Sequence, residues 1–301
     1  MNFGHSRNGM TMLELLVSTA IIAVLVGMSL SGIQSARETA RNMDCQNRMR
    51  QLGLAAQHFV SVHTIFPHNG GWNGHQVILA VDGTTFTPST ITTSINRYGV
   101  GDPNISVREQ TGSWIYSVLP YLEQPDLYQN RKWQIGLNTV VCPTRRDAEP
   151  LPIVTSDAYA TYISGGWEWS RSDFAGNRNI FPGTGQVFPD HNVRASGIID
   201  GLSNTLLIFE KSYNPRVQNG TNWFWDEPFF LGGSGGTVRW ESILSLDSVD
   251  SQFQRNLGSA HSAGVNMARA DGSVVRLSYS TAREIVDGAL SLHGNEILPF
   301  P

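Results

Sequence analysis

The pattern of apolar and polar positions first marks a long hydrophobic segment near the N-terminus. From Leu15 to Ala36 there are 22 consecutive residues without a charge, and 14 of them are Ala, Val, Ile, Leu or Met. As a helix rising about 1.5 Å per residue, this segment is about 33 Å long, enough to cross a hydrocarbon core about 30 Å thick. The apolar core of a secretory signal peptide has only about 7–15 residues. The pattern therefore predicts a membrane anchor.

The helical pattern continues beyond this hydrophobic segment. Apolar or aromatic side chains recur three or four residues apart, which places them on one face of a helix. This stripe consists of Cys45, Met49, Leu52, Ala56, Phe59 and His63. Pro67 and the pair Gly70-Gly71 predict that the helix ends near Thr64. We therefore expect one helix of about fifty residues that begins at Met10.

Beyond Gly70 the pattern changes to short β-rich segments separated by turn residues. The clearest element is a hairpin over residues 264–277, because Asp271-Gly272 between alternating segments favours a tight turn. Residues 281–290 can close the chain with a short helix. Other β-rich segments are residues 114–119, 205–209 and 274–279.

These elements predict an α+β fold in which a long N-terminal transmembrane and amphipathic helix packs on a largely antiparallel β-sheet body. Residues 69–102 are rich in Gly and Thr, and we expect them to form an insertion or a flexible loop.

Composition excludes several classes of function. The chain has 21 Lys and Arg residues against 25 Asp and Glu, a net charge of −4, so it has no basic excess for binding nucleic acid. Its apolar fraction of 40% is enough for a folded core. We find no cysteine and histidine that pair as a nucleophile and base, and we expect no enzyme.

A short motif precedes the hydrophobic segment. The residues Gly9-Met10-Thr11-Met12-Leu13-Glu14 resemble the cleavage and methylation motif of type IV pilins and pseudopilins. The resemblance implies that a prepilin peptidase cuts between Gly9 and Met10 and methylates the new N-terminus. It also implies that Glu14 pairs with the N-terminal amine of a neighbouring subunit during assembly. A carboxylate at the membrane edge is costly unless it is paired, which agrees with that role.

A second resemblance covers the rest of the chain. His261, nine further residues and then Asp271-Gly272 resemble the H-x9-DG element of the bacterial pilin-like DUF1559 family, which is abundant in planctomycetes. For His261, Asp271 and Gly272 we expect a structural role in fixing the hairpin turn. Further segments that resemble this family are residues 37–41, 45–47, 51–55, 119–124, 142–144 and 200–205.

Together the resemblances imply a membrane-anchored structural subunit, processed by prepilin peptidase and assembled with itself or other pilin-like subunits into a filament or a type II secretion-like apparatus. The expected organisation is a cytoplasmic leader (1–9), a transmembrane half-helix (10–36) and an extracytoplasmic body (37–301), helical over 37–64 and β-rich over 65–301. The expected location is the inner (cytoplasmic) membrane, with a single pass. The basic residues Arg37, Arg41, Arg48 and Arg50 after the span favour the opposite orientation by themselves.

The alternative function is a membrane-tethered, extracytoplasmic module that binds glycans or other ligands and uses the pilin leader only for targeting. Two tryptophan pairs, Trp167 with Trp169 and Trp223 with Trp225, would carry it if they are exposed. Core packing is the interpretation that we favour for both pairs.

The remaining candidate chemistry concerns cysteines and a metal ion. Cys45 and Cys142, the only thiols, can form a disulfide or remain two buried free thiols. We expect no cofactor. The resemblance to pseudopilins implies that calcium is the more plausible ion, since some of them bind it through oxygens of C-terminal loops. Such ligands could come from Asp200, Asp226, Glu227 and Asp271.

Overall fold

The structure is a computed structural model that describes residues 11–183, 192–215, 226, 228–248 and 256–294. The chain divides into two compact units, residues 1–43 and residues 44–301. The long helix α1 (Met12–His63) contributes to both units, and its bounds confirm the prediction of one helix of about fifty residues.

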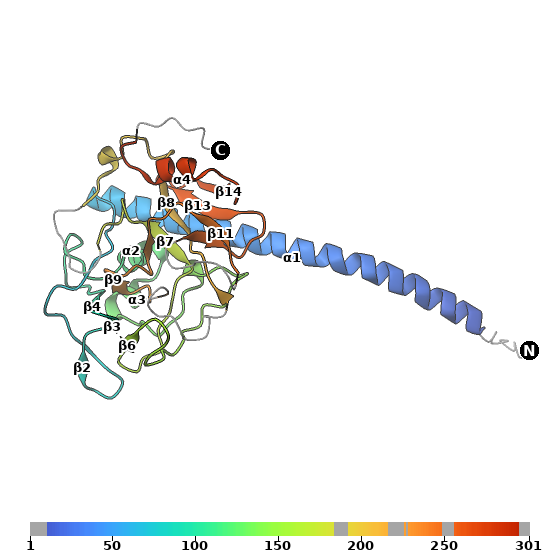
Figure 1. The fold of residues 1–301 in the computed structure, drawn as a ribbon, viewed down its shortest axis with the longest axis horizontal. Coiled ribbons are helices and arrows are strands. Elements are labelled where there is room, and N and C mark those ends of the chain that lie inside the picture. The colour runs from blue at the N-terminus through green and yellow to red at the C-terminus, as the bar shows by residue number, and fades with distance from the viewer. Residues whose placement is uncertain (1–10, 184–191, 216–225, 227, 249–255, 295–301) are drawn as a thin grey trace, which may run out of the picture. The chain divides into compact units, whose positions relative to one another are not determined.

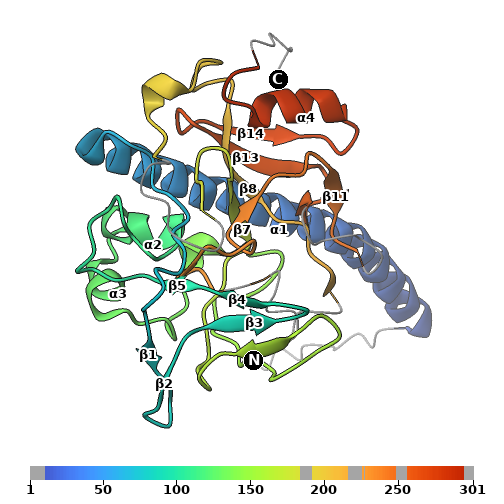
Figure 2. The same cartoon turned by 60° about the vertical axis from the view of Figure 1, so that its left-hand side comes forward.

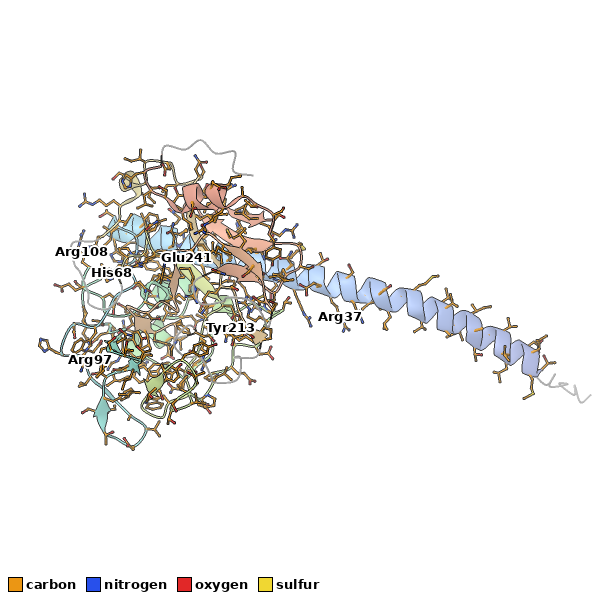
Figure 3. The ribbon with its side chains drawn as sticks, viewed as in Figure 1. Arg37, His68, Arg97, Arg108, Tyr213 and Glu241 are labelled. Carbon is orange, nitrogen blue, oxygen red and sulfur yellow. The ribbon has the colours of Figure 1, made fainter. Side chains whose placement is uncertain are left out.

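In the first unit, α1 carries its large apolar side chains on the surface. Side chains stand out all around this part of the helix (Figure 3), and the apolar ones between Met12 and Ile33 are exposed to solvent. Among the described residues, this is the one helix that is long and apolar enough to cross a membrane. An isolated helix with an exposed apolar surface needs lipid or other helices around it.

In the second unit, the predicted stripe on α1 is buried except at its last member, His63, which is half-buried. Cys45, Met49, Leu52, Ala56 and Phe59 are each at most 1% exposed, as the helical spacing predicts. The helix ends where we expect, because the next residue adopts a left-handed conformation, with φ of +63° at position 64.

A five-stranded sheet forms the centre of this unit (Figure 1). The strand order is β10-β7-β8-β13-β14, and all neighbours are antiparallel except β10 and β7. The bounds are β7 (Phe174–Asn177), β8 (Leu206–Glu210), β10 (Val238–Arg239), β13 (Val265–Arg269) and β14 (Val274–Leu277). The strands predicted at 205–209 and 274–279 and the hairpin over 264–277 are therefore confirmed.

Helices cover both faces of this sheet. Figure 2 shows α4 (Arg283–Leu290) on one side of β13 and β14, and α1 on the other. Side chains such as Phe209 and Met267 pack with α4, whereas Ile208 and Ala268 belong to the core that includes the α1 stripe. Alternation along each strand explains this division, because successive side chains point to opposite faces.

Short strands and helices make up the rest of the second unit. Residues 69–102, which we expected to be an insertion or flexible loop, instead contain five short strands. They are β1 (Ile78–Leu79), β2 (Thr85–Phe86), β3 (Ser89–Ile91), β4 (Ile95–Arg97) and β5 (Gly99–Val100). The other strands are β6 (Thr161–Ile163), β9 (Leu231–Gly232), β11 (Leu244–Leu246) and β12 (Leu257–Ser259).

One predicted strand is wrong. Residues 114–119 begin with a helix, α2 (Trp114–Val118), which is followed by a 3-10 turn and by α3 (Pro125–Asn130). The Ser113 hydroxyl accepts a hydrogen bond from the backbone N–H of Tyr116 at 3.2 Å. This N-cap satisfies a free backbone donor at the helix start and outweighs the β propensity of the aromatic residues.

Candidate functional site

The start of α1 shows how Glu14 is held within one chain. The Glu14 carboxylate accepts hydrogen bonds from the backbone N–H of Thr11 at 2.9 Å and from its hydroxyl at 3.0 Å. In return the Thr11 hydroxyl accepts from the backbone N–H of Glu14 at 3.3 Å. This reciprocal arrangement is a capping box, a role for Glu14 that the pilin motif did not indicate. Gly9 and Met10 lie outside the described residues.

The hairpin between β13 and β14 has the turn that its Asp-Gly pair predicts. The carboxylate of Asp271 accepts a hydrogen bond from the backbone N–H of Ser273 at 2.8 Å. Gly272 has a φ of +84°, a conformation that favours glycine. The Cα of Gly272 also lies so close to Gly53 of α1 that a Cβ at position 53 would come within 3.3 Å of it. The turn therefore packs on the helix.

His261 is placed differently from our expectation. We expected it to brace the Asp271 turn, but its ring lies against Cys142 and Glu210. The Nε2 atom of His261 is 3.5 Å from the Cys142 Sγ and 3.7 Å from a carboxylate oxygen of Glu210. The structure thus pairs a cysteine with a histidine, where the sequence indicated no such pair.

Four side chains meet at this place: Cys45, Cys142, Glu210 and His261. Their potential ligand atoms all lie within 4.8 Å of one another, and each residue is at most 1% exposed. The Cys45 thiol donates a hydrogen bond to the Glu210 carboxylate at 3.2 Å. We call these four residues the thiol cluster. Among the described residues they are the one group of His, Cys, Asp and Glu side chains with this proximity.

Each member of the thiol cluster comes from a different part of the second unit. Cys45 belongs to the buried stripe of α1, and Glu210 is the last residue of β8. Cys142 follows a 3-10 turn, and His261 follows β12. The fold brings Cys45, Glu210 and Cys142 together, because α1 packs across the sheet, β8 pairs with β7, and Asp173 directly before β7 bonds the backbone N–H of Cys142.

Backbone groups hold the cluster in place. The backbone N–H of Asn266 donates to the Glu210 carboxylate at 2.8 Å, and the backbone N–H of His261 donates to the Ser259 hydroxyl at 3.1 Å. The Tyr279 hydroxyl donates to the backbone carbonyl of His261 at 2.7 Å. These bonds fix the Glu210 carboxylate and the backbone of His261.

Burial and close contact change the acidity of the cluster. Burial raises the pKa of Glu210 to about 7, and the nearby Cys142 adds to this effect. The hydrogen bond with Cys45 lowers the pKa of Cys142 to about 4, aided by His261 and Arg145. The same bond, burial and Glu210 raise the pKa of Cys45 well above its ordinary value. The two thiols of the cluster therefore differ in acidity, and Cys142 is the more acidic of the two.

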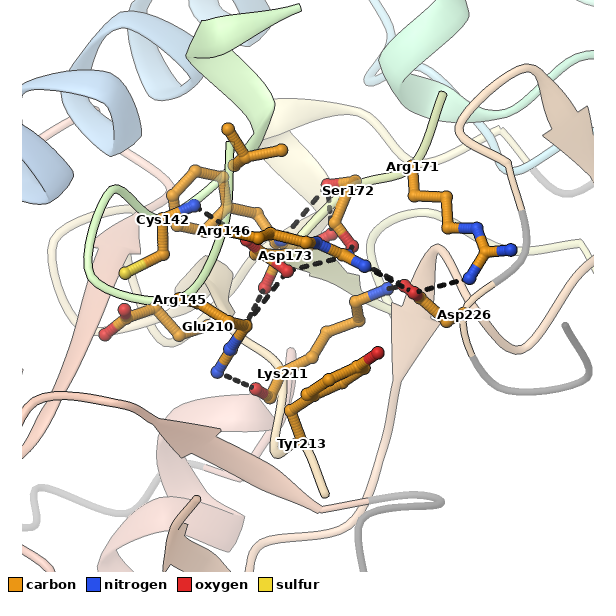
Figure 4. A network of polar contacts seen from close by, with 12 residues as sticks. Cys142, Arg145, Arg146, Arg171, Ser172, Asp173, Glu210, Lys211, Tyr213 and Asp226 are labelled. Atoms are coloured by element: carbon orange, nitrogen blue, oxygen red, sulfur yellow. Dashed lines mark hydrogen bonds and ion pairs between the residues drawn. The ribbon is translucent and has the colours of Figure 1, made fainter. Parts of the chain in front are cut away.

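A buried ion-pair network adjoins the thiol cluster (Figure 4). Asp226 pairs with Arg146 at 2.6 Å, with Lys211 at 3.1 Å and with Arg171 at 3.3 Å. Burial opposes the ionised form of Asp226, but these cations hold its pKa far below the ordinary range. Burial lowers the pKa of Lys211 to about 8.

A second acidic residue connects the network to the thiol cluster. Asp173 pairs with Arg146 at 2.7 Å and with Arg145 at 3.3 Å, and Arg145 also pairs with Asp247 at 2.9 Å. The other carboxylate oxygen of Asp173 accepts from the backbone N–H of Cys142 at 2.8 Å. The segment after Cys142 thus supplies both arginines of this connection.

Sequence reasoning missed Glu210 and this ion-pair network. One signal was present: Glu210-Lys211 directly follows the apolar residues 206–209, so two charged residues stand at the end of a buried strand. Charged residues are rarely buried unless they are paired.

Other candidate residues lie apart from this site. Trp169 is buried and stacks on Trp133 at a centroid distance of 5.3 Å, whereas Trp167 is half-buried. Trp223 and Trp225 lie outside the described residues. Both cysteines are free thiols in the structure, so the disulfide stays a prediction.

The residues suggested for calcium have other partners. Asp226 belongs to the ion-pair network, Asp271 to the hairpin turn, and Asp200 accepts from the backbone N–H of Gly294 at 2.9 Å. Glu227 lies outside the described residues.

Comparison with known families supports the N-terminal methylation motif and the resemblance to the DUF1559 family. The prokaryotic N-terminal methylation motif matches residues 4–30 and supports a type IV pilin-like precursor whose N-terminal helix associates with the membrane. A family described as a protein of unknown function (DUF1559) matches residues 34–284. No curated protein and no solved structure matches the chain. The chain therefore belongs to the DUF1559 family and begins with a prokaryotic N-terminal methylation motif.

Proposed function

We propose that this protein is a pilin-like structural subunit that assembles with copies of itself or with other pilin-like subunits, in a filament or a type II secretion-like apparatus. Prepilin peptidase cuts it between Gly9 and Met10 and methylates Met10. The observation that carries the proposal is the charge pattern of the helix. Between Met12 and Ala36, Glu14 is the only charged residue, and the apolar side chains around it are exposed.

The exposed apolar surface of α1 is suited first to the lipid bilayer and then to contact with other helices. A single helix of this length and composition is stable in the inner membrane as a single-pass anchor. The same surface can pack against equivalent helices of other subunits when the subunit leaves the bilayer. The body, residues 37–301, is extracytoplasmic in this proposal.

Glu14 gives such helix packing its register. Among the residues that the structure describes, its carboxylate is bonded to Thr11, and these hydrogen bonds do not neutralise its negative charge. Cleavage after Gly9 creates a positively charged amine at Met10. In an apolar bundle of helices, the amine of a neighbouring subunit is the partner that compensates Glu14.

One observation favours a second candidate, a tethered module that binds glycans. The half-buried Trp167 lines a partly open pocket together with Trp133, Arg131 and Val77. Its indole N–H donates to the backbone carbonyl of Leu79 at 2.9 Å, which fixes the ring at the pocket wall. An aromatic ring beside polar groups is a usual platform for sugar rings.

Cross-linking of the full-length protein in its native membrane separates the two functions. For a subunit we expect a ladder of multimers that is unchanged in Trp167→Ala, because the pocket plays no part in packing of α1. A protein that stays monomeric, yet binds a polysaccharide and loses that binding in Trp167→Ala, would establish the tethered module instead.

A further inference from the structure

We propose that the thiol cluster, formed by Cys45, Cys142, Glu210 and His261, is a structural zinc site that fastens α1 to the sheet. The inference depends on the fold of residues 44–301 alone, so its test is independent of whether the protein assembles into a filament. Its basis is the geometry, chemistry and surroundings of these four side chains.

The distances within the cluster fit one metal ion at its centre. In a tetrahedral zinc site with bonds of about 2.0–2.3 Å, neighbouring ligand atoms are roughly 3.3–3.8 Å apart. In the structure the separations are 3.2 Å from Cys45 Sγ to Glu210, 3.5 Å from Cys142 Sγ to His261, and 3.7 Å from His261 to Glu210. The remaining pairs of ligand atoms are also within 4.8 Å. Small side-chain shifts therefore complete the coordination shell.

The donor set selects zinc among common ions. Two thiolates and one imidazole are soft or borderline ligands that suit Zn²⁺, whereas calcium and magnesium prefer oxygen ligands alone. All four positions come from protein side chains that are at most 1% exposed, which leaves no open position for water or substrate. A closed four-ligand site of this kind is structural rather than catalytic.

A disulfide between the two cysteines explains less of the arrangement. It would account for Cys45 and Cys142, but it would give no reason for the carboxylate of Glu210 and the imidazole of His261 to meet at the same point. A metal ion accounts for all four side chains and needs both thiols in the reduced form.

The surroundings are suited to the charge of a filled site. Two thiolates, a carboxylate and Zn²⁺ leave one net negative charge, with His261 neutral. Arg145 lies near Cys142, because it pairs with Asp173 at 3.3 Å and Asp173 accepts a hydrogen bond from the backbone N–H of Cys142. The Asn266 N–H bond to the second oxygen of Glu210 orients the carboxylate, as outer groups commonly do around metal ligands.

The experiment uses the full-length protein, extracted in detergent without chelator and without added reductant. We expect elemental analysis to find one zinc per chain after extensive dialysis. After removal of zinc by a chelator, Co²⁺ should restore a tetrahedral, thiolate-bound visible spectrum, and Zn²⁺ but not Ca²⁺ should raise the thermal midpoint.

Matched variants connect the metal to the cluster. Glu210→Gln and His261→Gln should each weaken zinc binding by about 10–100-fold or more, whereas Glu109→Gln and His293→Gln, at exposed positions, should not change it. If the cluster variants do not fold, titration of the chelated wild-type protein with Zn²⁺ still decides the matter. Failure of the wild type to bind one zinc, one equivalent of a different metal, or an intact mass about 2 Da lower that reports a disulfide would each overturn the proposal.

Discussion

Asp226→Asn is expected to lower the free energy of unfolding by about 3–5 kcal/mol, because it leaves three buried cations without their shared counter-charge. Asp226 is 1% exposed and pairs with Arg146, Lys211 and Arg171. Asparagine has nearly the same shape as aspartate, so the effect reports charge rather than a cavity. Chemical denaturation of the full-length protein in detergent, followed by tryptophan fluorescence, measures the change.

The control for Asp226→Asn is an ion pair at the surface. Asp287 pairs with Arg283 at 3.7 Å, and both side chains are more than half exposed. Asp287→Asn should therefore change stability by no more than about 0.5 kcal/mol. If Asp226→Asn lowers the free energy of unfolding by no more than this control does, the buried network does not stabilise the body in the way that its geometry indicates.

Replacing Glu14 is expected to abolish assembly and to leave processing intact. Glutamine at this position keeps the capping box with Thr11, because a neutral amide oxygen can accept the same hydrogen bonds, but it cannot pair with an amine. We expect Glu14→Gln to reduce cross-linked multimers at least about tenfold, since an uncompensated buried amine costs well over 1.4 kcal/mol per contact. Glu14→Ala should lose assembly to the same extent.

Thr11→Ala is the matched control for the charge of Glu14. It removes the hydroxyl that bonds the carboxylate but retains the negative charge, so it should assemble nearly as well as the wild type. The opposite pattern, in which Glu14→Gln assembles and Thr11→Ala does not, would assign Glu14 to helix capping and contradict the proposed ion pair.

The local elements of this fold could be predicted because their signals lie within a few residues of one another. The charge-free segment and the stripe from Cys45 to Phe59 predict α1, and Asp271-Gly272 predicts the hairpin. The segment at residues 114–119 misled us, because a single cap from Ser113 decides its helical start. A cap of this kind is a weak signal against four β-prone residues.

The thiol cluster could not be predicted, because its members are far apart in the chain. No regular spacing relates Cys45, Cys142, Glu210 and His261, and the motif around His261 indicated the hairpin turn instead. Their meeting depends on the strand order β7-β8-β13 and on α1 lying across that sheet. Long-range topology of this kind leaves no periodic pattern in the sequence.

The N-terminus of the native, membrane-extracted protein is the measurement that tests the account most directly. Mass spectrometry of the N-terminal peptide should find a chain that begins at an N-methylated Met10, because prepilin peptidase both cuts after Gly9 and modifies the new amine. A chain that begins at an unmodified Met1 would contradict the account, since Glu14 would then have no amine at Met10 to pair with in a neighbouring subunit.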